Sequence, residues 1–418
     1  MMNKISKFLL FLSSIIILIL SYLIITEIEF NVKVIELPPE SGAKCLDGSN
    51  YRFQLMKGSG NGQDKFLLSF DGGGWCGSEA KLSSTTIEAC RKRALSFVGK
   101  KALPFAFTVS RVQQIFSSKK EYNPEFYNWN KVVIKYCDGF GHQSNNDNYG
   151  LHFRGLNNTL GVIDYLKKNL NFKQAESVIV SGFSAGGLAS LVWGNYIDAQ
   201  TDKKDNTYII PDSGVFYDLT AKDGNHYLSK IMKELIKYSG DNSKLLKTFC
   251  KIQNEDKLYK CFLPESIFEN IKLPILLVQN LYDTAVVGSL YREDCLFHKN
   301  FIDNCSKKDM DAIYDIGKTY ISKYRQLVKE HKNISAWIPR TLGHTFIVFN
   351  QYYDSETSKP KGISLMEMMT QWYRDVHAGK KSKYVNELIM EEDDKHIKEY
   401  KDWVYYTLAY NLFTIPGL

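Results

Sequence analysis

Residues 177–187 read SVIVSGFSAGG, an apolar β-branched run that ends in small residues around one serine. The apolar β-branched run before Gly182 predicts a buried strand of a parallel sheet. The small residues around Ser184 follow the pattern G-x-S-x-G, which is typical of a sharp turn from a strand into a helix. Such a turn presents its serine at a helix N-terminus, where backbone amides and the positive end of the helix dipole gather. The stretch therefore predicts an α/β fold with Ser184 as a nucleophile. The alternative is an ordinary turn in which Ser184 caps the helix.

Strands alternate with helices along the rest of the chain, which predicts a mostly parallel central sheet with flanking helices. The predicted strands are residues 51–56, 65–70, 131–137, 208–211, 273–279 and 334–338, the last of which we expect to be the final core strand. The first two are expected to pair as a hairpin across the glycine-rich loop 57–62. Helices are predicted in residues 85–97, 155–170 and 314–332, and residues 222–272 are expected to be mostly helical. Residues 383–418 are expected to form a packed C-terminal helix. Residues 77–130 and 222–272 are expected to supply cap insertions over a cleft.

A nucleophilic serine needs a base, and an acid that orients the base. In a parallel sheet these side chains come from the carboxyl ends of strands. Asp283 follows one predicted strand, and His344 lies in a predicted loop, 341–345, after the final one, so the chain order is Ser184, Asp283, His344. Asp212 also follows a strand and is the rival acid, although we favour Asp283. The alternative for His344 is a surface or helix-capping histidine.

A run of glycines, DGGGWC at residues 71–76, directly follows the second predicted strand. Glycines in this position allow backbone amides to converge on a small anion, as in the oxyanion hole of an esterase. The alternative is a plain glycine-rich turn. A phosphate-binding loop is disfavoured because the Gly-Lys-Ser/Thr ending is absent from the run.

The first 29 residues differ from the remainder of the chain. Lys4 and Lys7 precede an uncharged segment, residues 8–25, that is rich in Leu and Ile. Its length is at the boundary between a signal peptide and a membrane span. We predict a signal peptide or signal anchor in residues 1–29 and a single domain in residues 30–418. Both alternatives place the bulk of the chain outside the cytosol, secreted or lumenal, and an uncleaved segment would anchor it in a membrane.

Eight cysteines predict disulfides in an oxidising compartment, because no C-x-x-C pair or Cys/His cluster indicates zinc. Spacing alone does not fix the connectivity. Short loops favour Cys76 with Cys90, Cys250 with Cys261 and Cys295 with Cys305, which leaves Cys45 for Cys137.

Sequons and charge describe the expected surface. N-x-S/T sequons begin at Asn157, Asn304 and Asn333 and predict N-glycosylation. The net charge of +7 is spread along the chain, and no basic run is interleaved with stacking aromatic residues. Nucleic acid is therefore excluded as a partner.

These motifs together resemble the pectin acetylesterase and Notum carboxylesterase family. The matching motifs are CLDGS (45–49), KGSG (57–60), GGGWC (72–76), NPEFYNWN (123–130), YCDG (136–139), FRG (153–155), GFSAGG (182–187), DSG (212–214), YD (282–283) and GHT (343–345). The resemblance covers residues 43–375. It implies an α/β-hydrolase-like serine carboxylesterase without metal or cofactor, in which Ser184 is the nucleophile, Asp283 the acid and His344 the base. It also implies an oxyanion hole formed by the amides of Gly74, Trp75 and Ala185, and a structural role for Asp212.

Two segments depart from the family pattern, residues 140–142 and residues 284–286, and we expect both to touch the substrate groove. The leading hypothesis is a monomeric secreted or lumenal esterase that deacetylates pectin-like polysaccharide. Residues 45–60 and 127–130 resemble the polysaccharide-acting members of the family more closely, and the net charge of +7 suits an acidic polymer. The first alternative is Notum-like removal of a long acyl chain from a lipidated secreted protein. The second is a catalytically silent binding module on the esterase fold. The expected partner is thus an acylated polysaccharide or an acylated protein.

Overall fold

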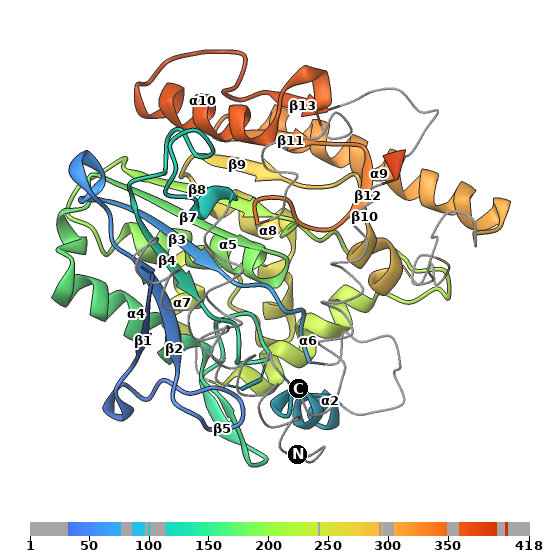
Figure 1. The fold of residues 1–418 in the computed structure, drawn as a ribbon. Helices are drawn as coiled ribbons and strands as arrows, with labels where there is room; N and C mark the ends of the chain where they lie inside the picture. The colour runs from blue at the N-terminus through green and yellow to red at the C-terminus, as the bar shows by residue number, and fades with distance from the viewer. Residues whose placement is uncertain are drawn as a thin grey trace, which may run out of the picture.

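A central, mostly parallel sheet organises the molecule (Figure 1). The computed structural model describes residues 32–76, 86–96, 99–100, 114–240, 243–291, 295, 305–348, 359–390 and 398–399. Within these residues the sheet has nine strands in the order β1-β2-β4-β3-β7-β8-β9-β11-β13. They are β1 (Val32–Glu36), β2 (Arg52–Met56), β3 (Lys65–Phe70), β4 (Asn130–Ile134), β7 (Ser177–Phe183), β8 (Thr207–Asp212), β9 (Ile275–Val278), β11 (Ile334–Ile338) and β13 (Leu388–Met390). From β4 to β13 all neighbours are parallel, which confirms the predicted α/β class.

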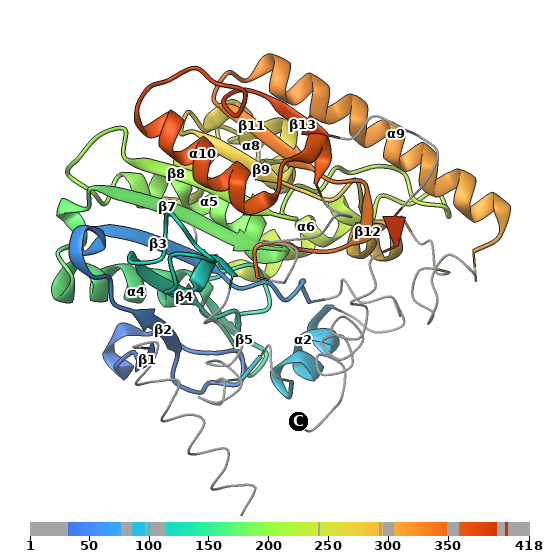
Figure 2. The ribbon, with the colours of Figure 1, turned by 45° about the horizontal axis from the view of Figure 1, so that its top comes forward.

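Both faces of the sheet are buried, which explains why its strands are apolar at consecutive positions. In β7, Val178 and Val180 pack into one core and Ile179 packs into the other. Figure 2 shows α10 in front of the sheet and α4 and α5 behind it. The helices that pack on the Val178 side include α4 (Gly155–Asn169), α5 (Ala185–Asp198), α6 (Tyr227–Ser239), α7 (Ser243–Phe249), α8 (Pro264–Asn270) and α9 (Lys307–Glu330). Among the described residues, the α-helix α10 (Leu365–His377) packs on the Ile179 side.

The predicted hairpin of the first two strands is wrong. β2 and β3 both pair with β4, which lies between them. The glycines of loop 57–62 serve close packing against the chain that enters β4. A Cβ on Gly62 would lie 2.1 Å from the carbonyl oxygen of Asn128, and Gly58 donates its amide to Asn130 Oδ1 at 2.9 Å. Glycines in this loop therefore do not indicate that the two flanking strands pair.

The predicted C-terminal helix in residues 383–418 is wrong at its start. Residues Leu388–Met390 form β13, which pairs in parallel with β11, so β11 is not the last core strand. Asn386 anchors the entry to β13, because its Nδ2 donates to the carbonyls of Val328 and Ile334 at 3.1 Å each. Three apolar residues are too short a run to produce a sequence signal. The rest of the predicted helix lies outside the described residues, except for β14 (Lys398–Glu399).

Four disulfides join the eight cysteines in the predicted pairing. The pairs are Cys45–Cys137, Cys76–Cys90, Cys250–Cys261 and Cys295–Cys305, the pairing that short loops favour. The second disulfide ties the glycine run after β3 to α2 (Thr86–Ala94), where we predicted a helix.

The predicted leader and one predicted glycosylation site lie outside the described residues, and two glycosylation sites lie within them. Residues 1–29 and Asn304 lie outside the described part of the chain, in which no helix is long and apolar enough to cross a membrane. Asn333 donates its Nδ2 to the carbonyls of Ile271 at 3.2 Å and Leu273 at 2.8 Å, and Asn157 Oδ1 is buried. A glycan on the amide of Asn333 would have to replace these two hydrogen bonds. Glycosylation at all three sequons stays a prediction.

Candidate active site

Ser184 lies in the predicted sharp turn between β7 and α5. Its backbone has φ 58° and ψ −127°, a region that residues other than glycine rarely adopt. The Ser184 amide donates to the carbonyl of Asp212 at 2.8 Å, and its own carbonyl accepts from the amide of Leu188 at 3.1 Å. These backbone hydrogen bonds hold the strained conformation. Because α5 begins at the next residue, the positive end of its dipole lies at Ser184.

Glycines around Ser184 let three chain segments touch. A Cβ on Gly182 would lie 2.3 Å from the carbonyl oxygen of Gly186, and one on Gly186 would lie 2.1 Å from that of Phe70. Any larger side chain would therefore push α5 away from β3. A Cβ on Gly72 would lie 2.9 Å from the Cβ of Ser184. The glycine run after β3 thus lies directly against the candidate nucleophile.

His344 and Asp283 are brought together by a second, smaller sheet. Nδ1 of His344 lies 2.8 Å from Oδ2 of Asp283, and their side chains are 8% and 3% exposed. The two residues come from β10 (Tyr282–Asp283) and from the end of β12 (Thr341–Gly343), which pair in parallel. Residues 341–343 were predicted as a loop and form this short strand instead. Asp283 Oδ1 also accepts from the amides of Ala285 at 3.0 Å and Val286 at 3.2 Å, so backbone donors fix the carboxylate.

Asp212 links the turn of Ser184 to the loop that follows β12. Its backbone carbonyl accepts a hydrogen bond from the amide of Ser184. Its Oδ2 accepts hydrogen bonds from the amides of Phe346 at 2.6 Å and Ile347 at 2.8 Å. The neighbouring Ser213 Oγ accepts from the amide of Thr345 at 2.9 Å. One short segment therefore holds both the nucleophile turn and the histidine loop.

Two residues with amide side chains follow β9 and were not among the site residues predicted from the sequence. Gln279 donates its Nε2 to Oδ2 of Asp283 at 3.2 Å. Asn280 donates to the carbonyl of Gly343 at 3.0 Å and accepts from the amide of Thr341 at 3.3 Å. Both residues brace the two short strands that carry Asp283 and the histidine. The available signal was their position, because polar residues directly after a buried strand lie at the edge where ligands bind.

The environment of His344 raises its pKa above the ordinary value of 6.5. Burial acts in the opposite direction and is the largest single effect, but the charge and hydrogen bond of Asp283, together with the charge of Asp212, outweigh it. Burial also raises the pKa of Asp212, to about 6, although the amides of Phe346 and Ile347 and the hydroxyl of Ser213 favour its charged form. His344 therefore holds a proton more tightly than a free histidine does.

The pH dependence of activity follows from this shift. Only neutral His344 can accept a proton, so kcat/KM should fall as the pH drops through an apparent pKa above 6.5. Replacement of Asp283 by asparagine removes the charge and should lower the histidine pKa, which NMR titration of the imidazole would measure. An unshifted titration in Asp283→Asn, or a wild-type acid limb well below 6.5, would contradict the assignment.

Gly74, Trp75 and Ala185 lie on the two segments that flank Ser184. Gly74 and Trp75 follow Gly72 in the glycine run, and Ala185 is the first residue of α5. Gly74 has φ 64°, and Trp75 is buried edge-on against Phe216 with ring centroids 5.2 Å apart. The run is thus an ordered turn at the carboxyl end of β3.

Residues 140–142 do not line a groove as expected. Phe140 has no exposed surface and packs on Phe153 with ring centroids 5.1 Å apart. His142 is 1% exposed, and its Nε2 lies 2.8 Å from the carbonyl oxygen of Asp71. The second departure, residues 284–286, supplies two of the amides that hold Asp283. The second departure therefore helps to hold the acid, and its contact with a substrate groove stays a prediction.

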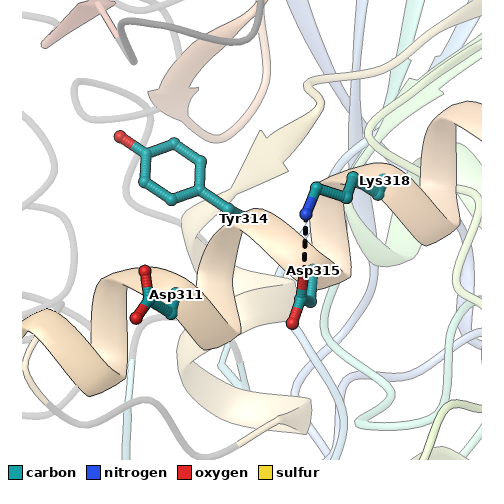
Figure 3. A pocket seen from close by; sticks show the side chains of 4 residues that line it. All are labelled: Asp311, Tyr314, Asp315 and Lys318. Carbon is teal, nitrogen blue, oxygen red and sulfur yellow. Dashed lines mark hydrogen bonds and ion pairs between the residues drawn. The ribbon is translucent and has the colours of Figure 1, made fainter.

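A separate surface hollow lies over α9 (Figure 3). Its lining is Asp311, Tyr314, Asp315 and Lys318. Lys318 Nζ lies 3.0 Å from Asp315 Oδ1, and both side chains are largely exposed. The hollow shares no residue with the site around Ser184. Within the described residues no group of three or more His, Cys, Asp or Glu side chains is arranged to hold a metal ion.

Comparison with known proteins gives two groups of relatives. The chain is 33% identical to pectin acetylesterase 5 of Arabidopsis thaliana over 257 residues, 60% of this chain and 57% of the relative. It is 24% identical to palmitoleoyl-protein carboxylesterase notum2 of Xenopus laevis over 362 residues, 82% of this chain and 67% of the relative. A planarian relative, palmitoleoyl-protein carboxylesterase NOTUM of Schmidtea mediterranea, is 26% identical over 60% of this chain and 48% of its own length.

The chain spans little more than half the length of the first of these relatives. The family model described as pectinacetylesterase matches residues 25–393, which include β1 to β13 and every candidate site residue. A match of this extent shows that the chain belongs to the pectinacetylesterase family.

Proposed function

We propose that this protein is a serine carboxylesterase that hydrolyses O-acyl esters. The observation that supports this best is the link through Asp212, which connects the strained turn of Ser184 to the loop behind His344. Since His344 is in turn hydrogen-bonded to Asp283, nucleophile, base and acid belong to one hydrogen-bonded framework. This arrangement disfavours the alternative of a catalytically silent binding module.

In the proposed mechanism His344 takes the hydroxyl proton of Ser184 as the oxygen attacks the ester carbonyl. Asp283 holds the Nδ1 proton and stabilises the imidazolium. The backbone amides of Gly74, Trp75 and Ala185 would stabilise the oxyanion of the tetrahedral intermediate. We call these three groups the oxyanion amides. His344 then protonates the leaving alcohol, which leaves an acyl group on the serine. Water that is deprotonated by the same histidine releases the carboxylic acid and regenerates the enzyme.

We propose acetyl esters of a pectin-like polysaccharide as the substrate. The relatives named pectin acetylesterase reach 33% identity, whereas the palmitoleoyl-protein carboxylesterases reach 26%. The net charge of +7 suits an acidic polymer. The second candidate is removal of a long acyl chain from a protein, and the longer alignment with the Xenopus relative, over 82% of this chain, favours it.

We place the protein outside the cytosol, secreted or lumenal. Its four disulfides fit an oxidising compartment. The signal peptide or anchor in residues 1–29, a single esterase domain in residues 30–418 and the monomeric state are parts of this proposal.

A series of nitrophenyl esters from acetyl to palmitoyl tests the acyl group. A lipid tunnel would contribute about 0.8 kcal/mol per buried CH₂, so a long-chain enzyme should gain about fourfold in kcat/KM with each added CH₂. We expect the reverse for the purified protein, with the highest kcat/KM on acetyl esters and a decline from hexanoyl onward. Acetate should also be released from acetylated pectin. A maximum at octanoyl or longer, with no acetate released, would contradict this substrate and support the long-chain alternative.

A further inference from the structure

Two buried side chains hold three consecutive carbonyls of the glycine run. The guanidinium of Arg93, from α2, donates to the carbonyl of Gly73 and, at 3.2 Å, to that of Trp75. The hydroxyl of Tyr136, two residues after β4, donates to the carbonyl of Gly74 at 2.6 Å. Arg93 is 6% exposed and Tyr136 is 1% exposed. These bonds account for the direction of each peptide group from residue 73 to residue 76.

The direction of a carbonyl fixes the direction of the next amide. In a trans peptide the C=O and the following N–H point to opposite sides of the chain. Because the Gly73 carbonyl points to Arg93, to which it is hydrogen-bonded, the amide of Gly74 points away from Arg93. With the Gly74 carbonyl on Tyr136, the amide of Trp75 points away from Tyr136. These amides are two of the three proposed oxyanion amides.

We propose that Arg93 and Tyr136 are positioning residues that aim and strengthen the oxyanion amides. This inference rests on the proposed serine esterase mechanism and deepens it. A charged donor on a carbonyl polarises the peptide group, which makes the N–H of the same group a stronger donor. The effect grows with the negative charge on the substrate oxygen, so it stabilises the transition state more than bound substrate.

The surroundings keep both positioning residues in place. The disulfide Cys76–Cys90 ties the end of the glycine run to α2, the helix that carries Arg93. A Cβ on Gly73 would lie 2.3 Å from the ring of Tyr136, so only glycine lets the ring lie against the turn. The Tyr136 hydroxyl also accepts from the amide of Gly141 at 3.3 Å. The two side chains are thus fixed from separate elements of the fold.

The test compares Tyr136→Phe and Arg93→Gln with a matched control, Tyr51→Phe. Tyr51 is a buried tyrosine whose hydroxyl donates to a backbone carbonyl, that of Lys135, at 2.9 Å. We expect Tyr136→Phe to lower kcat between about 10- and 100-fold with little change in KM, somewhat less than removal of an oxyanion donor itself. Arg93→Gln should lose at least as much, and Arg93→Lys, which keeps the charge, should recover part of it. Tyr51→Phe should keep its kcat.

A trifluoromethyl ketone that forms a tetrahedral adduct on the serine gives a second readout. Its affinity should fall by the same factor as kcat in Tyr136→Phe and Arg93→Gln, and melting temperatures would identify variants that do not fold. Full kcat and full inhibitor affinity in folded Tyr136→Phe and folded Arg93→Gln would overturn the inference, and so would an equal loss in Tyr51→Phe. Failure of the proposed function is distinguishable, because the wild type itself would then neither hydrolyse esters nor bind the ketone.

Discussion

Replacement of Ser184 by alanine is expected to lower kcat on the order of 10⁶-fold, to the level that binding and the oxyanion amides alone sustain. The side chain lost is the attacking group itself, so saturating substrate cannot compensate. The fold should survive, because a φ of 58° at this position strains the backbone of alanine as much as that of serine. Steady-state kinetics together with thermal melting measure both effects.

Ser181→Ala is the matched control for this change. Ser181 lies three residues earlier on β7, is fully buried, and donates its hydroxyl to the carbonyl of Ile210 at 2.8 Å. Loss of that hydrogen bond should cost about 1 kcal/mol of the free energy of unfolding and leave kcat nearly unchanged. Turnover within tenfold of wild type in Ser184→Ala would rule out a nucleophilic role for this serine.

Replacement of Asp283 by asparagine should lower kcat by about 10⁴-fold in a folded protein. The asparagine keeps the shape of the side chain but no longer holds the Nδ1 proton of His344, to which the carboxylate is bonded at 2.8 Å. The imidazole then takes the tautomer that cannot accept a proton from the serine. The change should appear in kcat on saturating ester, with circular dichroism as the check on folding.

Asp212→Asn is the control for the second carboxylate. Asp212 accepts from the amides of Phe346 and Ile347, so its replacement should lower the free energy of unfolding by about 1 to 3 kcal/mol. Its effect on kcat should be far smaller than that of Asp283→Asn. The reverse pattern, with Asp212→Asn the more damaging to kcat, would transfer the acid role to Asp212.

The parts predicted from sequence are those that short stretches encode. The turn at Ser184 could be predicted because its strand, glycines and helix start are contiguous. Asp283 and His344 could be chosen because each follows a predicted strand, and the structure pairs them. The fold class followed from strands that are apolar at consecutive positions.

The parts that were missed depend on partners that are distant in sequence. β4 separates β2 from β3, and no local pattern shows which strand takes the middle position. Residues 140–142 were placed at the groove by their difference from the family pattern, but Phe140 is packed in the core. Arg93 and Tyr136 donate hydrogen bonds to the backbone of residues 73–75 from positions up to 62 residues away. A side chain that bonds to a backbone carbonyl is not part of a recognisable sequence motif.

The most direct test of the esterase proposal is the site of covalent modification by a fluorophosphonate, mapped by mass spectrometry of the digested protein. We expect one adduct, on Ser184, that forms in parallel with the loss of esterase activity and is absent from Ser184→Ala. Two results would contradict the esterase proposal: loss of esterase activity through an adduct on a different residue, or esterase activity that persists when Ser184 is fully modified.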